Sequence, residues 1–225
     1  SLTIDNALPR VSNIRVLATT DLDGDGDATT AVNGDTLECL YDYEDSDNDP
    51  DLSTLAWTID GAAAVAGLNR LSEGFASGSE VRCELSPSDG FITLAPIDAT
   101  ITIGNAPPIV LDARVQPTEP IFTSDELSLE VTTDDLDGQT VTYTASWYVD
   151  SVWVGDGDTL DGQQHFDKHQ EVYADVHPND GVTTGSSFQT PTVTISNSIP
   201  KAVQVAIDPQ TLYAGDVPTC SYQFR

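Results

Sequence analysis

Basic residues and methionine are scarce in this sequence. Its 225 residues include 8 Lys+Arg against 37 Asp+Glu, which gives a formal net charge of −29, and no methionine at all. Proteins bind nucleic acids by neutralising phosphates with Lys and Arg, and basic segments attract proteins to anionic membrane surfaces. Since only Lys168 and Lys201 are lysines, we expect no nucleic-acid partner and no attraction to such a surface.

Long apolar runs are missing as well. No run approaches the roughly 18 residues that a membrane span needs, and no basic-then-apolar signal segment opens the chain, so we expect no membrane insertion. The opening Ser1-Leu2-Thr3-Ile4 lacks an initiator methionine and reads as the middle of a strand. We therefore expect an internal segment of a longer polypeptide. With 39% apolar residues and three tryptophans, the composition is that of a folded chain.

An internal repeat organises the residues that are present. The pattern x-Thr-Ile-x-Asn-x-x-Pro occurs three times, with isoleucines at 4, 103 and 195. Trp57 matches Trp147 at an offset of 90 residues, and Pro87-x-Asp89-Gly90 matches Pro178-x-Asp180-Gly181 at 91. Self-similarity of this kind is typical of repeat arrays. We expect, in order, the last strand of a preceding repeat at 1–7, repeat 1 at 8–105, repeat 2 at 106–198 and the first strands of a truncated repeat 3 at 199–225.

Short alternating strands dominate each repeat, and strong helical patterns are absent. In repeat 1, period-two alternation predicts strands at 11–18, 36–43, 55–59, 80–85 and 97–103. Clusters of Gly, Pro, Asn and Asp separate them. Six to eight short strands in about 95 residues predict an all-β fold made of tandem immunoglobulin-like antiparallel β-sandwiches.

Cys39, Trp57 and Cys83 follow one another in the order of the immunoglobulin core. In that fold the cysteines of strands B and F are bonded across a buried tryptophan of strand C. Repeat 2 has Leu129 and Ala174 at the two cysteine positions, and this joint loss favours a disulfide over two buried thiols. A Cys39–Cys83 bond would close a loop of about 44 residues, stabilise by roughly 4 kcal/mol, and indicate an oxidising, extracellular setting.

The units resemble the tandem immunoglobulin-like repeats of large bacterial surface proteins, in the neighbourhood of PKD-like and cadherin-like modules. The resemblance is carried by the junction 103–108, the turn 134–138, the strand 146–150 and the segment 176–181. The Trp-Asp-Phe-Gly-Asp-Gly motif of strict PKD domains is absent. The resemblance implies a stalk, an adhesin or a filament subunit, often with bound calcium, whose partners are neighbouring repeats or like chains in a fibre. The third cysteine, Cys220, matches Cys39, and its partner is expected beyond Arg225.

Asp-rich turns are the candidate calcium sites. Calcium takes six to eight oxygen ligands, which alternating Asp in a Gly-relaxed turn can supply. The turn 21–27 is similar to the first half of an EF-hand loop, but Val32 stands where the bidentate Glu belongs. The simpler interpretation is that Asp and Gly favour turns and keep the chain soluble. The predicted ligands are Asp21, Asp23, Asp25, Asp27, Asp45, Asp47, Asp49, Asp51, Asp134, Asp135 and Asp137.

An asparagine occupies each repeat junction, and it has two interpretations. The segment Ile4-Asp5-Asn6-Ala7-Leu8-Pro9 is similar to a shortened cadherin linker, which holds interdomain calcium. The alternative is a capping asparagine before a turn that proline stiffens, and we favour it.

Other functional patterns are weak. The sequence has no Gly-x-Ser-x-Gly, Walker or dinucleotide motif, so we expect no enzyme. His165 and His169 lie near a predicted strand end, where a spacing of four does not bring side chains together, so a zinc site is not expected. Exposed Trp153 with Tyr148 could stack on a sugar, which makes a carbohydrate- or cell-binding module of an adhesin the alternative function. Cover for a sheet edge is the simpler role for Trp153.

Overall fold

A computed structural model describes residues 5–198, 200–208, 210–211 and 213–224. The chain is all-β, as predicted, and the one helix among these residues is the single turn α1, Gly162–His165. Residues 1–4 of the expected last strand, and residues 199, 209, 212 and 225 of the expected repeat 3, lie outside the described part; residues 5–7 form no strand. No helix in the described part is long and apolar enough to cross a membrane.

The chain divides into two compact units. One comprises 1–112 with 131–143 and 177–188, and the other 113–130 with 144–176 and 189–225. Each has its own hydrophobic core, formed by residues between 14 and 103 in the first and between 115 and 195 in the second. Each core therefore lies within one sequence repeat, while the repeat boundaries at 105 and 198 stay predictions.

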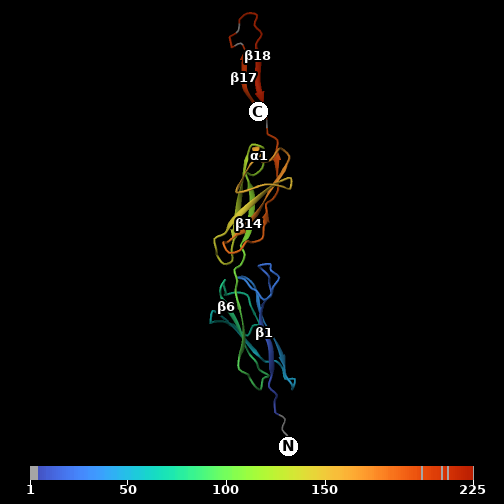
Figure 1. The fold of residues 1–225 in the computed structure, drawn as a ribbon, viewed down its shortest axis with the longest axis vertical. Coiled ribbons are helices and arrows are strands. Elements are labelled where there is room, and N and C mark those ends of the chain that lie inside the picture. The colour runs from blue at the N-terminus through green and yellow to red at the C-terminus, as the bar shows by residue number, and fades with distance from the viewer. Residues whose placement is uncertain (1–4, 199, 209, 212, 225) are drawn as a thin grey trace. The chain divides into compact units, whose positions relative to one another are not determined.

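Two antiparallel sheets form repeat 1. One has the order β1 (Arg10–Ala18), β2 (Leu37–Glu44), β5 (Arg70–Leu71); the other has the order β4 (Ala62–Ala66), β3 (Thr54–Ile59), β6 (Glu80–Ser86), β7 (Ile97–Thr102). Figure 1 shows β1 and β6 on the two sides of this sandwich. Alternation explains the faces, because Val81, Cys83 and Leu85 of β6 are buried while the residues between them are half-buried.

Repeat 2 has the same architecture. One sheet has the order β13 (Thr159–Asp161), β10 (Glu126–Asp134), β8 (Ile109–Gln116). The other has the order β12 (Val152–Asp156), β11 (Thr142–Val149), β14 (Glu171–Asn179), β16 (Val193–Ser196), β9 (Ile121–Phe122), and β15 (Phe188–Gln189) also pairs with β14. Since β9 runs parallel to β16, the chain crosses between sheets after β8. Repeat 1 makes the same crossing through a parallel bridge between Val32 and Gly104.

A tryptophan lies at the centre of each core. Trp57 and Trp147 are fully buried, and each indole N–H donates to a backbone carbonyl, of Leu68 at 3.0 Å and Gly157 at 2.8 Å. Trp57 stands opposite Cys83 in the β3–β6 register. Cys83 is disulfide-bonded to Cys39, as predicted. Together these residues form an immunoglobulin-like β-sandwich core.

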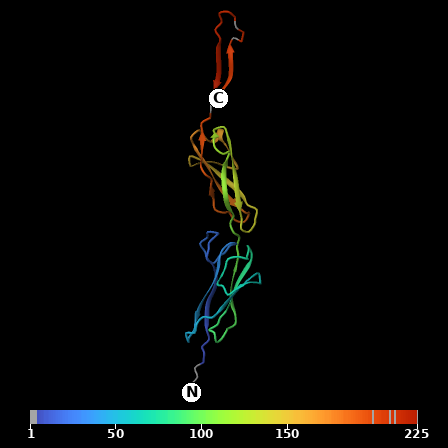
Figure 2. The same cartoon turned by 180° about the vertical axis from the view of Figure 1, so that it is seen from behind.

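Beyond repeat 2 lies an antiparallel hairpin of β17 (Ala202–Asp208) and β18 (Thr219–Phe224). Figure 2 shows the two strands in red, paired only with each other. Cys220 on β18 is free and exposed. Two strands without a packed face are marginally stable in water, and that they begin a further sandwich stays a prediction.

Candidate metal centres

The segment before repeat 1 and two loops of repeat 1 meet around a set of oxygen atoms that we call junction site 1, formed by Asn6, Asp45, Asp47, Asp49 and Asp89. Asn6 comes before β1, the aspartates 45–49 form the turn that follows β2, and Asp89 follows β6. The Asn6 side-chain amide donates to Asp89 Oδ2 at 2.8 Å, and the backbone N–H of Ala7 donates to Asp47 Oδ2 at 2.6 Å. The junction segment is thus bonded to both loops.

Asp45 organises its own turn. Its Oδ1 accepts the backbone N–H groups of Asp47 at 2.8 Å and Asp49 at 3.2 Å, which is an Asx-type turn. Its Oδ2 is buried and has no donor. Carboxylate oxygens of Asp45, Asp49 and Asp89 lie within 4.8 Å of one another. Negative charges are therefore concentrated around an oxygen that no protein donor satisfies.

The two loops respond differently to this crowding. Desolvation, followed by repulsion from Asp45, Asp47 and Asp89, raises the pKa of Asp49. Asp89 is 1% exposed, and hydrogen bonds from the Ile92 N–H and the Asn6 amide lower its pKa. Asp89 is thus held in its charged form beside other carboxylates. That arrangement is costly unless a cation is bound.

The same arrangement occurs where the junction at Asn105 meets two loops of repeat 2. We call it junction site 2, and its members are Asn105, Asp135, Asp137, Gln139 and Asp180. The Asn105 amide donates to Asp180 Oδ2 at 2.7 Å, and the Ala106 N–H donates to Asp137 Oδ2 at 2.8 Å. Asp135 Oδ1 accepts from the N–H groups of Asp137 at 2.8 Å and Gln139 at 3.1 Å. Every one of these bonds has its counterpart in junction site 1.

Four oxygens of junction site 2 are buried without a hydrogen-bond donor: Asn105 Oδ1, Asp135 Oδ2, Asp137 Oδ1 and Gln139 Oε1. Another atom of each residue is hydrogen-bonded within the site. These atoms are the amide nitrogen of Asn105, the second carboxylate oxygens of Asp135 and Asp137, and the backbone N–H of Gln139. The donorless oxygens are therefore what remains after the protein's own bonds are made. Native proteins leave few such atoms, and each costs about 1–3 kcal/mol when nothing binds it.

Asp180 closes junction site 2. Its Oδ1 accepts the N–H groups of Val182 and Thr183, both at 2.7 Å. Gly181, with φ +91, allows the turn that directs these groups back to the carboxylate. Desolvation opposes ionisation, but the bonds from the Asn105 amide and these N–H groups lower the pKa of Asp180 to about 2. A permanent negative charge thus stands beside the donorless oxygens.

The donor set fits a hard cation. Both sites offer carboxylate and amide oxygens only, with neither histidine nor cysteine among their members. Calcium takes such oxygens in flexible geometry, whereas zinc and copper prefer nitrogen or sulfur. In junction site 1, oxygens of Asp45, Asp49 and Asp89 lie within 4.8 Å of one another, close enough for one divalent ion to contact all three. The residues present therefore fit calcium.

The Asp21–Asp27 loop gathers three carboxylates in a different setting. Oxygens of Asp21, Asp23 and Asp25 lie within 4.8 Å of one another, and the three residues are exposed or half-buried at the surface. Desolvation and the neighbouring acids raise the pKa of Asp23. The Asp27 carboxylate instead accepts hydrogen bonds from the hydroxyl and the backbone N–H of Thr29, and these bonds lower the pKa of Asp27. None of these residues has a buried donorless oxygen, so calcium in this loop stays a prediction without further support.

Besides the Asp21–Asp27 loop, two further predicted ligands, Asp51 and Asp134, lie apart from the junction sites. Asp51 accepts the Tyr41 hydroxyl at 2.9 Å and the Ser53 N–H at 3.0 Å, and burial followed by the bond to Asp51 raises the pKa of Tyr41 to about 12. Asp134 is exposed at the end of β10. Neither Asp51 nor Asp134 belongs to a group of three carboxylates whose oxygens lie within 4.8 Å of one another in the described part.

Sequence reasoning missed Asp89, Asp180 and Gln139 as members of these sites, and for the junction asparagines it favoured capping over calcium binding. Asn6 and Asn105 do not act as caps through their oxygens, because it is the amide nitrogen that donates, to a neighbouring carbonyl and to an aspartate. A usable signal existed, since the Asp-Gly of each Pro-x-Asp-Gly segment and the Asn of each junction recur in the repeat frame.

The remaining candidates are two histidines and a group of aromatic residues. His165 ends α1 and His169 follows it, and neither joins a metal-like group in the described part. Trp153 on β12 is 56% exposed, stands opposite Tyr148, and donates to Asp156 at 3.1 Å. Tyr148 stacks on Tyr173 with ring centroids 5.0 Å apart. The outer face of this sheet therefore carries three neighbouring aromatic rings.

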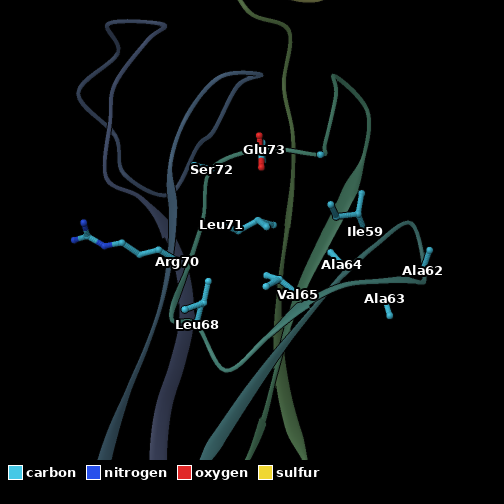
Figure 3. A pocket seen from close by; sticks show the side chains of 11 residues that line it. Ile59, Ala62, Ala63, Ala64, Val65, Leu68, Arg70, Leu71, Ser72 and Glu73 are labelled. Carbon is cyan, nitrogen blue, oxygen red and sulfur yellow. The ribbon is translucent and has the colours of Figure 1, made fainter.

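An open groove of about 510 Å³ lies between the β3–β4 hairpin and β5. Figure 3 shows the apolar side chains of Val65 and Leu71 in the middle of the view, with Arg70 directed away from them. Arg70 is ion-paired with Glu38 at 3.2 Å. The lining contains Ser72 and Glu73 but neither histidine nor cysteine. The absence of enzymatic activity stays a prediction.

Comparison with known proteins found distant structural likenesses. No protein-family model matches the sequence, and no curated protein has significant similarity to it. Fibronectin(III)-like modules of Clostridium thermocellum CbhA match with TM-score 0.30 and 9% identity over 75% of this chain and 88% of that chain. A two-domain fibronectin type III segment of chicken tenascin matches with 0.36 and 11% over 84% and 99%. Three N-terminal domains of the bacteriophage RB49 outer capsid protein Hoc match with 0.33 and 15% over 97% and 70%.

At these scores the likenesses carry no argument about function. The immunoglobulin-like sandwich rests on the two sheets, the crossing strand and the tryptophan core of each repeat. The PKD-like and cadherin-like affinities remain resemblances of the sequence.

Proposed function

We propose that this chain is a non-enzymatic structural segment of an extracellular repeat array, and that calcium bound at each junction site fixes the junction to the sandwich that follows it. The observation that carries the proposal is the same arrangement of hydrogen bonds built twice around buried oxygens without donors, one in junction site 1 and four in junction site 2. A turn that served only solubility would have no reason to bury oxygens away from both water and protein donors.

The ion would act on the chain between sandwiches. Asn105 Oδ1 belongs to the junction, Asp135 Oδ2 and Asp137 Oδ1 belong to the turn after β10, and all three lack a donor. A cation bound to them would link segments already joined by the Asn105 and Ala106 bonds. Pro107 and Pro108 fix the next φ angles. A junction held in this way would bend less than a flexible linker.

The disulfide supports the extracellular setting. Such bonds persist in oxidising compartments and are rare in the cytosol, and calcium at millimolar concentration is available outside cells to sites of modest affinity. Stalk, adhesin and fibre roles all fit a calcium-stiffened segment, with neighbouring repeats or like chains as its partners.

Thermal unfolding of the full chain tests the proposal. Calcium at one hundred times its Kd should stabilise by about 2.7 kcal/mol per site, which raises the Tm of a repeat by roughly 10 °C or more. Sodium chloride at matched ionic strength is the control, because screening of the −29 charge also stabilises the fold. Identical melting curves in calcium, in matched salt and in excess chelator would refute the calcium role.

The aromatic face of repeat 2 supports a second candidate, carbohydrate binding by an adhesin. Trp153, Tyr148 and Tyr173 lie on neighbouring strands of one outer face, and aromatic rings can stack on the apolar faces of sugars. Titration with oligosaccharides, followed by tryptophan fluorescence, tests this candidate. Saturable quenching that is lost in Trp153→Ala would support it, and an unchanged signal across a glycan panel would exclude it.

A further inference from the structure

The two junction sites differ in one ligand. Positions 45, 47 and 89 of junction site 1 are Asp, and so are the matching positions 135, 137 and 180 of junction site 2. The exception is Asp49, whose counterpart is Gln139. Junction site 1 therefore has four carboxylates and one amide, while junction site 2 has three carboxylates and two amides.

Asp49 and Gln139 occupy the same place in their turns. The backbone N–H of Asp49 bonds to Asp45 Oδ1 at 3.2 Å, and that of Gln139 bonds to Asp135 Oδ1 at 3.1 Å. The side-chain oxygens also correspond, since the Asp49 carboxylate lies within 4.8 Å of Asp45 and Asp89 oxygens and Gln139 Oε1 is a buried oxygen without a donor. One residue thus changes the charge of the site while it still presents an oxygen.

We infer that junction site 1 binds calcium more tightly than junction site 2, and that the residue at position 49 or 139 sets this difference, so that the repeats load and release calcium in sequence. The inference rests on the proposed calcium function. The fourth carboxylate adds direct attraction for a divalent cation. It also adds repulsion when the ion is absent, and the ion relieves that repulsion on binding. Both effects act in the same direction.

The expected size is about tenfold or more in Kd, because the number of charged ligands is one of the two factors that spread the affinities of calcium sites over several orders of magnitude. The other factor, site rigidity, is closely similar here, since four hydrogen bonds of one site each have a counterpart in the other. Junction site 2 adds two bonds of the Thr183 hydroxyl, one from the Asn105 amide and one to Asp180. As calcium falls, junction site 2 would empty first. The segment at Asn105 would then loosen while the segment at Asn6 stayed fixed.

The test measures each site alone in the full chain. Asp21→Asn with Asp23→Asn and Asp25→Asn removes the exposed loop as a binder in every sample. Adding Asp135→Asn with Asp137→Asn leaves only junction site 1, and adding Asp45→Asn with Asp47→Asn leaves only junction site 2. Calorimetric titration with calcium chloride then gives the two Kd values, and circular dichroism confirms that each variant is folded.

Reciprocal exchanges are the matched controls. Asp49→Gln should weaken junction site 1 about tenfold, to the level of junction site 2, and Gln139→Asp should tighten junction site 2 by a similar factor. Equal Kd values for the two sites, or exchanges that leave both values unchanged, would overturn this inference while leaving calcium binding intact. Absence of calcium binding at both sites would instead overturn the proposed function, and this inference with it.

Discussion

Replacing Asp135 by asparagine should have opposite effects with and without calcium, and this makes it the sharpest test of a junction site. Asp135 Oδ1 accepts two backbone N–H groups, at 2.8 and 3.1 Å, and the oxygen of an asparagine amide can keep that role. The donorless Oδ2 becomes an NH₂ group. It then becomes a donor in a site where Asn105 Oδ1 and Asp137 Oδ1 also lack donors.

The magnitudes follow from these contacts. In chelator, the new donor can make one hydrogen bond and one negative charge disappears, so Asp135→Asn should stabilise repeat 2 by about 1 kcal/mol. That corresponds to a rise in Tm of about 4–8 °C for a unit of this size. In calcium, the loss of a ligand carboxylate should remove most of the stabilisation by the ion, about 2.7 kcal/mol at one hundred times Kd, and Tm should fall.

The assay is thermal unfolding by circular dichroism of the full chain and its variant, in calcium and in excess chelator. Asp134→Asn removes the same charge one residue away, at an exposed position, and should change stability by less than about 0.5 kcal/mol in either condition. If Asp135→Asn moved Tm in the same direction in both conditions, the donorless oxygens would not be a cation site and the reasoning would fail.

Three further predictions concern repeat 1 and the cores. Removing the disulfide by Cys39→Ala with Cys83→Ala should cost about 4 kcal/mol in urea unfolding, because the bond closes a loop of 44 residues; a cost below about 1 kcal/mol would contradict this. Trp147→Phe should cost about 2–4 kcal/mol, since it leaves a cavity in the core and removes the hydrogen bond to the Gly157 carbonyl, and an unchanged urea midpoint would show that the core is loosely packed. Tyr41, whose pKa is raised to about 12, should add stability that is complete below about pH 10 and lost as pH rises through about 12, and absorbance titration should show Asp51→Asn lowering that pKa.

The sequence predicted the strands with alternating burial better than the short strands β4 and β5. Expected strands at 11–18, 55–59 and 80–85 are found at 10–18, 54–59 and 80–86, because buried and exposed residues alternate along them. β4, Ala62–Ala66, was missed because its small residues do not alternate and most are exposed. The two residues of β5 are too few for any period. The formation of strands such as β4 and β5 depends on pairing with neighbouring strands more than on their own sequence pattern.

For a similar reason, the sequence predicted the aspartates of the turns as site members but not Asp89 and Asp180. The aspartates of the turns stand out because they are adjacent in the chain, and their alternation is visible locally. Asp89 and Asp180 come to the sites from loops 83 and 75 residues beyond the asparagines that bond them. Only the sandwich topology, which places the turn after the second strand beside the loop after β6 or β14, brings these segments together.

Comparing the repeats within one chain separates what packing requires from what it does not. Cys39 and Cys83 are replaced in repeat 2 by Leu129 and Ala174, and the second core forms with an apolar pair in the place of the disulfide. Apolar contacts can therefore substitute for that bond. The junction sites have no such substitute, because leaving four oxygens buried without donors opposes folding in proportion to their number. Repeat 2 keeps this unfavourable feature although it has dispensed with the disulfide, and a bound cation is the partner that would turn the same oxygens into a stabilising contact.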